Sequence, residues 1–292
     1  MVLYCVHCRP VFNQHYFNNR KEINMNVLQI KDNLVCEISK CKEVKGIAQT
    51  GDINAILVPG QSDIDLFVLC TDIPEKKERE LIYSAFAGQY SDCSMNVCNG
   101  GMWGYGDILV IDGIEVMPMY FTVKEMKLYV EETLQGKHLG MTGGFYPTGR
   151  LSSIETINIL YEEDSVWSDM KAMVKRPPAE LFHKLFQFHI SRVLNEEDLG
   201  RVILRKEALF YHQVLENSLD HLLQALYALN HTYFPSRKRM EEYIRRFENK
   251  PDNCYERLLQ ILKLSVLSDT IEDSVRELKC LAREIEVSGN YN

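Results

Sequence analysis

Two aspartates stand at the head of an apolar run in this sequence. Asp63 and Asp65 stand just before the segment 66–69, whose residues Leu-Phe-Val-Leu are typical of a buried strand. Aspartate is rare inside strands, and burying an unpaired carboxylate is energetically costly. The pair therefore needs either a solvated strand end or a bound cation.

The spacing of the pair indicates a metal site. Side chains alternate along a strand, so Asp63 and Asp65 share one face, about 7 Å apart. Mg²⁺ prefers carboxylate, water and phosphate oxygens, and two such ions can stabilise the attacking and leaving oxygens of a displacement at phosphorus. The other interpretation is a solvated strand end that follows a turn at Ser62. For an isolated Asp-x-Asp this second interpretation is the stronger one.

Strand and helix patterns alternate around the pair. Strands are predicted over 44–50, 64–70, 94–98, 107–111 and 114–121, and helices over 75–89 and 124–135, with a short helical stretch over 53–58. The dipeptide Asp112-Gly113 predicts a type I′ hairpin turn between the last two strands. Together these elements indicate an α+β (α/β) domain with a small mixed sheet.

The second half of the chain has a different pattern. Residues 136–150 contain five glycines and are predicted to form a linker. Beyond them no strand pattern is found, and apolar residues recur at helical spacing, which predicts an all-α bundle. Residues 1–24 follow no period. We therefore expect an N-terminal extension over 1–24, a sheet domain over 25–136 and a helical domain over 151–292.

A glycine turn and a third carboxylate accompany the aspartate pair. Gly51 stands twelve residues before Asp63, after an apolar strand and before the short helical stretch, and Glu115 lies on a later strand. This layout resembles the nucleotidyltransferase superfamily. The segments WGYGDILVIDGIEVMPMYFT and ALYALNHTYFPSRKR resemble its helical-tailed members, the relatives of kanamycin and lincosamide nucleotidyltransferases. The resemblance covers Val44 to Arg246.

The resemblance implies an enzyme that moves a nucleoside monophosphate from a nucleoside triphosphate to an acceptor hydroxyl. Asp63, Asp65 and Glu115 match the catalytic carboxylates that bind Mg²⁺, and two ions are expected. The triphosphate is the co-substrate. The acceptor is expected to be a small, antibiotic-like molecule bound by the helical domain.

The predicted nucleotide contacts come from the turn and from one basic segment. Gly51 matches the turn whose amides contact phosphates, because glycine lets a phosphate approach closely. Asp52 follows it, and Ser62 precedes the aspartate pair. The segment Ser236–Arg239 has two interpretations: an N-capping serine with solvated charges, or basic residues in a first helical turn that need a phosphate partner. In the second interpretation Lys238 contacts the triphosphate.

A general base for the acceptor hydroxyl has candidates in the helical half. Glu207 and Tyr211, and likewise His212 and Glu216, are spaced four residues apart on one predicted helix. The other interpretation is a set of ordinary polar residues at the edge of a core helix.

Two departures from the family pattern leave alternatives open. Asp52 stands where the family has serine, and Met117 stands where close relatives often carry aspartate. One alternative is a protein that keeps the fold and binds a nucleotide without turnover. Another is a toxin-like enzyme that modifies tRNA or a protein, which would need basic residues gathered along a cleft.

Composition limits the classes of protein to which this chain could belong. A hydrophobic share of 46% and a charged share of 25% are typical of globular chains. The net charge of −8 disfavours a nucleic-acid partner. No apolar run reaches the roughly 18 residues of a membrane span, so no membrane partner is expected. Nine cysteines without a secretory signal predict reduced thiols and a cytoplasmic protein.

Overall fold

The computed structural model describes residues 20–290, with side chains described over 26–289. The chain divides into two compact units. Unit 1 holds the residues up to Glu131 together with Ser153–Arg176, and unit 2 holds Glu132–Ser152 and the residues from Pro177 onward. The predicted extension over 1–24 lies largely outside the described residues, and helix α1 (Arg20–Ile38) begins within it.

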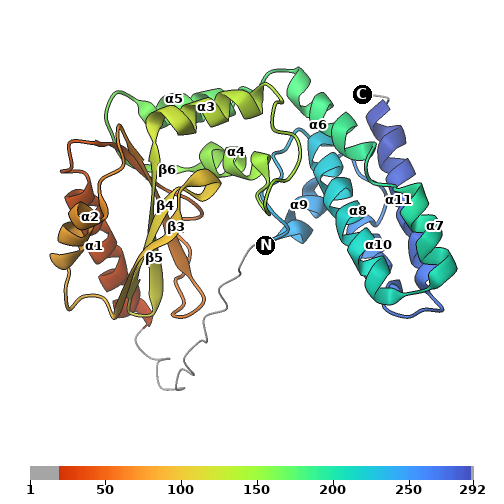
Figure 1. The fold of residues 1–292 in the computed structure, drawn as a ribbon, viewed down its shortest axis with the longest axis horizontal. Coiled ribbons are helices and arrows are strands. Elements are labelled where there is room, and N and C mark those ends of the chain that lie inside the picture. Colours follow the sequence, from red (N-terminus) through yellow and green to blue (C-terminus); the bar gives the residue numbers. More distant parts are fainter. Residues whose placement is uncertain (1–19, 291–292) are drawn as a thin grey trace. The chain divides into compact units, whose positions relative to one another are not determined.

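Unit 1 is built on a mixed sheet (Figure 1). Among the described residues its six strands lie in the order β3-β4-β5-β2-β1-β6. β2 and β5 run parallel, whereas every other neighbouring pair is antiparallel. The predicted α+β class is confirmed. The strands are β1 (Val44–Gln49), β2 (Asp63–Cys70), β3 (Asp92–Asn99), β4 (Tyr105–Ile111), β5 (Ile114–Thr122) and β6 (Asn158–Glu162).

Helices cover both faces of this sheet. Apolar side chains of α1 and α2 (Lys76–Ser84) join those of β1, β2 and β5 in one buried core. Helix α5 (Val166–Val174) packs on β1 and β6 at the opposite face. There Gly46 makes a close approach possible, because a Cβ at this position would lie 2.7 Å from the Trp167 ring. The ring of Phe67 stacks on Trp167 at a centroid distance of 6.3 Å.

The hairpin between β4 and β5 has the predicted turn. Asp112 and Gly113 both have positive φ, 49° and 77°, as a type I′ turn requires. The turn also holds the loop that precedes β2, since the Gly60 amide donates to the Gly113 carbonyl at 2.7 Å. A Cβ at Gly113 would lie 3.0 Å from Pro59.

The predicted helix over 53–58 is wrong, since this stretch is turn and irregular chain. Pro59 disfavours helical backbone at the residue before it. The Asp52 carboxylate also accepts a hydrogen bond from the Asn54 amide at 2.9 Å, which favours a local turn over a helix.

The prediction that no strand follows the linker is also wrong. β6 pairs antiparallel with β1 and becomes the outermost strand on that side of the described sheet. The linker itself is shorter than predicted, because α4 (Pro147–Thr156) begins inside it. Both α4 and α3 (Val123–Leu134) contain a boundary between the two units.

Unit 2 is helical, as the periodicity beyond residue 180 predicts. Helix α8 packs against α6, α7 and α11, and α11 packs in addition against α10. The C-terminal half of α8 is almost entirely buried. No helix in the described part of the chain is long and apolar enough to cross a membrane. The helices are α6 (Glu180–Ile190), α7 (Glu196–Arg205), α8 (Ala208–Leu229), α9 (Met240–Arg246), α10 (Cys254–Leu264) and α11 (Ile271–Asn290).

Candidate active site

The starts of β2 and β5 and the end of β1 lie side by side, and these strand ends form one edge of the unit 1 sheet. In the parallel register Asp63 lies beside Glu115, and Asp65 lies beside Met117. The Thr50 amide, directly after β1, donates to the Asp65 carbonyl at 3.1 Å. The fold therefore brings the aspartate pair, Glu115 and the turn at Gly51 to the same edge.

The carboxylates lie on the face of the sheet opposite to α1 and α2. Ile64 and Val116 alternate with them and are buried in the core beneath those helices. Asp63 and Glu115 are exposed, and Asp65 is half-buried. Since register neighbours on adjacent strands are about 4.8 Å apart, Asp63 and Glu115 are direct neighbours on this face.

Two carboxylates at this edge have no side-chain partner among the described residues. The side chains of Asp63 and Glu115 make no hydrogen bond or ion pair with the residues that the structure describes. The segments 51–65 and 112–117, which form the edge, contain five carboxylates and no lysine or arginine. Carboxylates crowded without a cation repel one another, so the edge favours a bound cation.

The third carboxylate is placed beside the first aspartate and not beside the second. Met117 occupies the position next to Asp65, so Glu115 lies two residues away from that register. Within residues 26–289 no group of three or more His, Cys, Asp or Glu side chains is arranged to hold a metal ion by itself. Carboxylate donors fit Mg²⁺, which commonly takes one or two of them and completes its shell with water and phosphate oxygens.

The turn at Gly51 presents open backbone. Gly51 has φ of +78°, and nothing lies within 4 Å of the position that a Cβ would take. The two polar side chains predicted to contact nucleotide have roles in the loop. Asp52 accepts from the Asn54 amide, and the Ser62 hydroxyl accepts from the Val58 amide at 2.8 Å. Both side chains thus help to shape the loop 52–62.

A further polar residue lies at this edge. Asn158, the first residue of β6, donates its side-chain amide to the Gly51 carbonyl at 3.0 Å. No sequence signal marked it, because the strand that carries it was not predicted.

Lys238 belongs to unit 2, where it is exposed. Its amide donates to the Ser236 hydroxyl at 3.1 Å, before α9 begins. The N-cap of α9 is Arg239, in a left-handed conformation, and the first turn carries acidic residues. Both predictions for this segment, an N-capping serine and a basic first turn, are therefore wrong. The predicted contact between Lys238 and a triphosphate stays a prediction.

The candidate general bases lie on α8, or directly before it. Tyr211 is buried, donates to or accepts from the Ser274 hydroxyl at 2.8 Å, and burial raises its pKa to about 12. His212 Nε2 lies 3.0 Å from the Ser265 hydroxyl. Tyr211 thus bonds a residue of α11 and His212 bonds the C-cap residue of α10, which favours the interpretation as core-edge residues.

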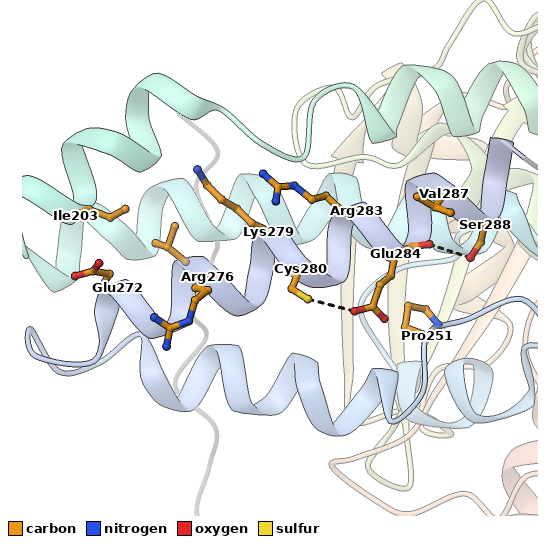
Figure 2. A pocket seen from close by; sticks show the side chains of 11 residues that line it. Ile203, Pro251, Glu272, Arg276, Lys279, Cys280, Arg283, Glu284, Val287 and Ser288 are labelled. Carbon is orange, nitrogen blue, oxygen red and sulfur yellow. Dashed lines mark hydrogen bonds between the residues drawn. The ribbon is translucent and has the colours of Figure 1, made fainter.

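A groove of about 750 Å³ runs along α11 in unit 2 (Figure 2). Its charged side chains are largely engaged with neighbours. Lys279 pairs with Glu196, and the Cys280 thiol donates to Glu284 at 3.3 Å. None of the residues predicted for nucleotide or metal lines it.

Comparisons with known proteins find similarity among solved structures. No protein-family model and no curated protein sequence matches the chain. Among solved structures, it is similar to a nucleotidyltransferase-like protein from Exiguobacterium sibiricum, with a TM-score of 0.49 and 13% identity, over 91% of this chain and 77% of that one. It is also similar to spectinomycin adenyltransferase AAD(9) from Enterococcus faecialis, solved with ATP and spectinomycin, with a TM-score of 0.32 and 12% identity. That match covers 90% of this chain and 99% of the other.

Proposed function

We propose that this protein is a Mg²⁺-dependent nucleotidyltransferase that moves a nucleoside monophosphate from a nucleoside triphosphate to a hydroxyl of a small molecule. The observation that supports this most is the parallel register of β2 and β5. It makes Asp63 and Glu115 neighbours on one face, with Asp65 on the same face and the open Gly51 turn beside them.

The metal would be held by Asp63, Asp65 and Glu115, with two ions expected. When bound, it neutralises charge on the triphosphate and activates the α-phosphorus for attack. The exposed positions of Asp63 and Glu115 leave space for phosphate and water oxygens to complete the coordination.

The remaining work at this edge is positioning. Amides of the turn that begins at Gly51 would bind phosphate oxygens, with Ser62 and Lys238 as further predicted contacts. The acceptor hydroxyl then loses its proton to water, its oxygen forms a bond to the α-phosphorus, and the bond from that phosphorus to pyrophosphate breaks. Holding the attacking and leaving oxygens in line supplies much of the rate. The helical domain would bind the acceptor. The free thiols of Cys70 and Cys254, both buried, support a reducing, cytoplasmic setting.

Charge-neutral variants of the aspartate pair test this proposal. Asp63→Asn and Asp65→Asn should each abolish Mg²⁺-dependent triphosphate binding in isothermal titration calorimetry, because the amide is a poor ligand for a hard cation. Asp92→Asn is the matched control, since it removes one exposed carboxylate from β3, at the other side of the sheet. Equal triphosphate affinity in wild type and both variants would overturn the proposal.

A second candidate function is nucleotide binding without transfer. Met117 beside Asp65 and the acidic Asp52 in the turn favour it, since one position lacks a ligand and the other adds a negative charge. Pyrophosphate release separates the two candidates. Release with a panel of hydroxyl-bearing small molecules supports the transferase. Mg²⁺-dependent binding with no release, and release gained in Met117→Asp, supports the binding protein.

A further inference from the structure

Asn158 ties the turn to the outermost strand of the sheet. Its side-chain amide donates to the Gly51 carbonyl at 3.0 Å and lies 3.5 Å from the Gln49 carbonyl. In the antiparallel register Asn158 is the partner of Gln49, the last residue of β1. The side chain therefore extends the contact between β6 and β1 past the end of their backbone pairing, into the turn.

The hydrogen bond sets the direction of one peptide group. In a trans peptide the carbonyl and the following amide N–H point in opposite directions within one plane. The chain has no cis peptide in its described part. Because the Gly51 carbonyl points to β6, the Asp52 amide N–H points away from β6. That is the side on which β2 lies, and β2 carries Asp63 and Asp65.

The donor so directed is available. Neither the Gly51 amide nor the Asp52 amide donates to another residue of the described chain, and both residues are exposed. Gly51 needs such a restraint, since glycine at positive φ has wide conformational freedom. A single bond to its carbonyl removes much of that freedom.

We infer that Asn158 is a positioning residue: it fixes the Gly51–Asp52 peptide so that the Asp52 amide faces a phosphate oxygen of the triphosphate. The inference rests on the proposed function, because it concerns the same site. It assigns to β6 a role in nucleotide binding.

The strand that carries Asn158 is itself well anchored at its other end. The Glu162 carboxylate accepts from the Trp167 and Ser168 amides, at 3.1 and 3.0 Å, and so caps the start of α5. Asn158 therefore extends from a strand held at both ends, which suits a residue that restrains the Gly51 peptide.

Asn158→Leu is the sharpest test, because it keeps a side chain of similar size and removes the donor without adding a charge beside the proposed phosphate position. We expect its Kd for a Mg²⁺–triphosphate to rise about tenfold, the usual effect of losing one well-placed hydrogen bond. Asn158→Gln, which keeps the amide donor, should recover part of the affinity. Glu162→Gln is the control for damage to β6, since it weakens the far end of the strand and should leave the Kd unchanged.

A measurement without nucleotide separates this inference from the proposed function. The ¹³C shift of the Gly51 carbonyl and the hydrogen exchange of the Asp52 amide should both change in Asn158→Leu and stay at wild-type values in Glu162→Gln. Unchanged Gly51 and Asp52 signals overturn the inference, as does wild-type triphosphate affinity in Asn158→Leu. If the wild type bound no triphosphate while these signals changed, the proposed function would fail and the restraint on the peptide would stand.

Discussion

Unit 1 contains carboxylates in two opposite surroundings, and the contrast separates a structural group from one suited to bind a ligand. Asp107, on β4, has no exposed surface, and both of its carboxylate oxygens accept hydrogen bonds. It accepts from Arg79 Nε at 2.7 Å and Nη2 at 3.2 Å, from the Tyr83 hydroxyl at 2.9 Å and from the Asn96 amide at 2.8 Å. Its negative charge is offset entirely by protein groups.

The carboxylates at the start of β2 and β5 have the reverse arrangement. Asp63 and Glu115 are exposed neighbours, and neither bonds a described residue. A buried carboxylate without partners would be costly, and Asp107 shows how this unit avoids that cost. The exposed pair carries no such compensation, so its charge is available to a cation.

Asp107→Ala should destabilise unit 1 by about 3–5 kcal/mol, because it leaves the Arg79 guanidinium buried and unpaired. Both tryptophans, Trp103 and Trp167, lie in unit 1, so urea unfolding followed by fluorescence reports on it. Asp92→Ala serves as the exposed control.

Replacing both partners sharpens this result. The double variant Arg79→Met/Asp107→Leu should recover part of the lost stability, since no charge is then left unpaired. A single variant as stable as wild type would contradict a structural role for Asp107.

Unit 2 contains a buried histidine, His189, that is kept neutral. His189 Nδ1 lies 2.9 Å from His221 Nδ1, and its Nε2 lies 3.0 Å from the Leu139 carbonyl. Burial first, and then the neighbouring His221, lower the pKa of His189 from 6.5 to about 3. Below pH 6.5 the unfolded chain therefore binds a proton that the folded chain does not.

The free energy of unfolding of unit 2 should consequently fall as the pH drops from 6.5 toward 3. The His189 contribution to this loss is about 2 kcal/mol at about pH 5. Far-UV circular dichroism during urea unfolding at a series of pH values measures it, with His189→Gln as the comparison. Identical pH slopes in wild type and variant would show that His189 is not the group responsible.

Asp52→Asn should tighten triphosphate binding by about 1 kcal/mol, because it removes a negative charge beside the proposed phosphate position. The amide oxygen can still accept from Asn54, so the turn is kept. Asp52→Ser should give a gain of the same sign. Calorimetry measures both, and an unchanged Kd in the two variants would mean that Asp52 faces away from the nucleotide.

Asp63→Asn should change the stability of unit 1 by no more than about 0.5 kcal/mol, and in the stabilising direction, since like charges on register neighbours repel. The same fluorescence experiment serves here, with Glu115→Gln as the matched partner. A loss as large as that expected for Asp107→Ala would place Asp63 among the structural carboxylates and remove the contrast.

Local signals account for the parts of unit 1 that were predicted correctly. The hairpin turn was found because Asp112-Gly113 contains its own conformational requirement, positive φ at both residues. The strands from β1 to β5 and the helix α2 were found because their apolar spacing lies within short windows. These elements also predict which segments meet at the candidate site. They do not predict the register between β2 and β5, which puts Met117, and not Glu115, beside Asp65.

Non-local contacts explain what was missed. β6 is a strand because it pairs with β1, more than a hundred residues earlier in the chain, and its five residues carry no alternation strong enough to mark it. The stretch 53–58 has helical spacing. A helix of six residues nevertheless gains too few hydrogen bonds to offset the free energy of nucleation. Asn158 could not be found at all, since its role depends on both of these outcomes.

The late position of β6 in the sequence has a consequence for how unit 1 can be produced. Residues 132–152 belong to unit 2, and only after them does the chain supply β6 and α5. Until then, the β1 edge has open amides and carbonyls beside the apolar Ile47 and Ala48, a surface that invites pairing with other chains. A fragment that stops at residue 136 would therefore be prone to aggregate, and during synthesis the first half of the protein must wait for residue 176 before its sheet is closed on that side.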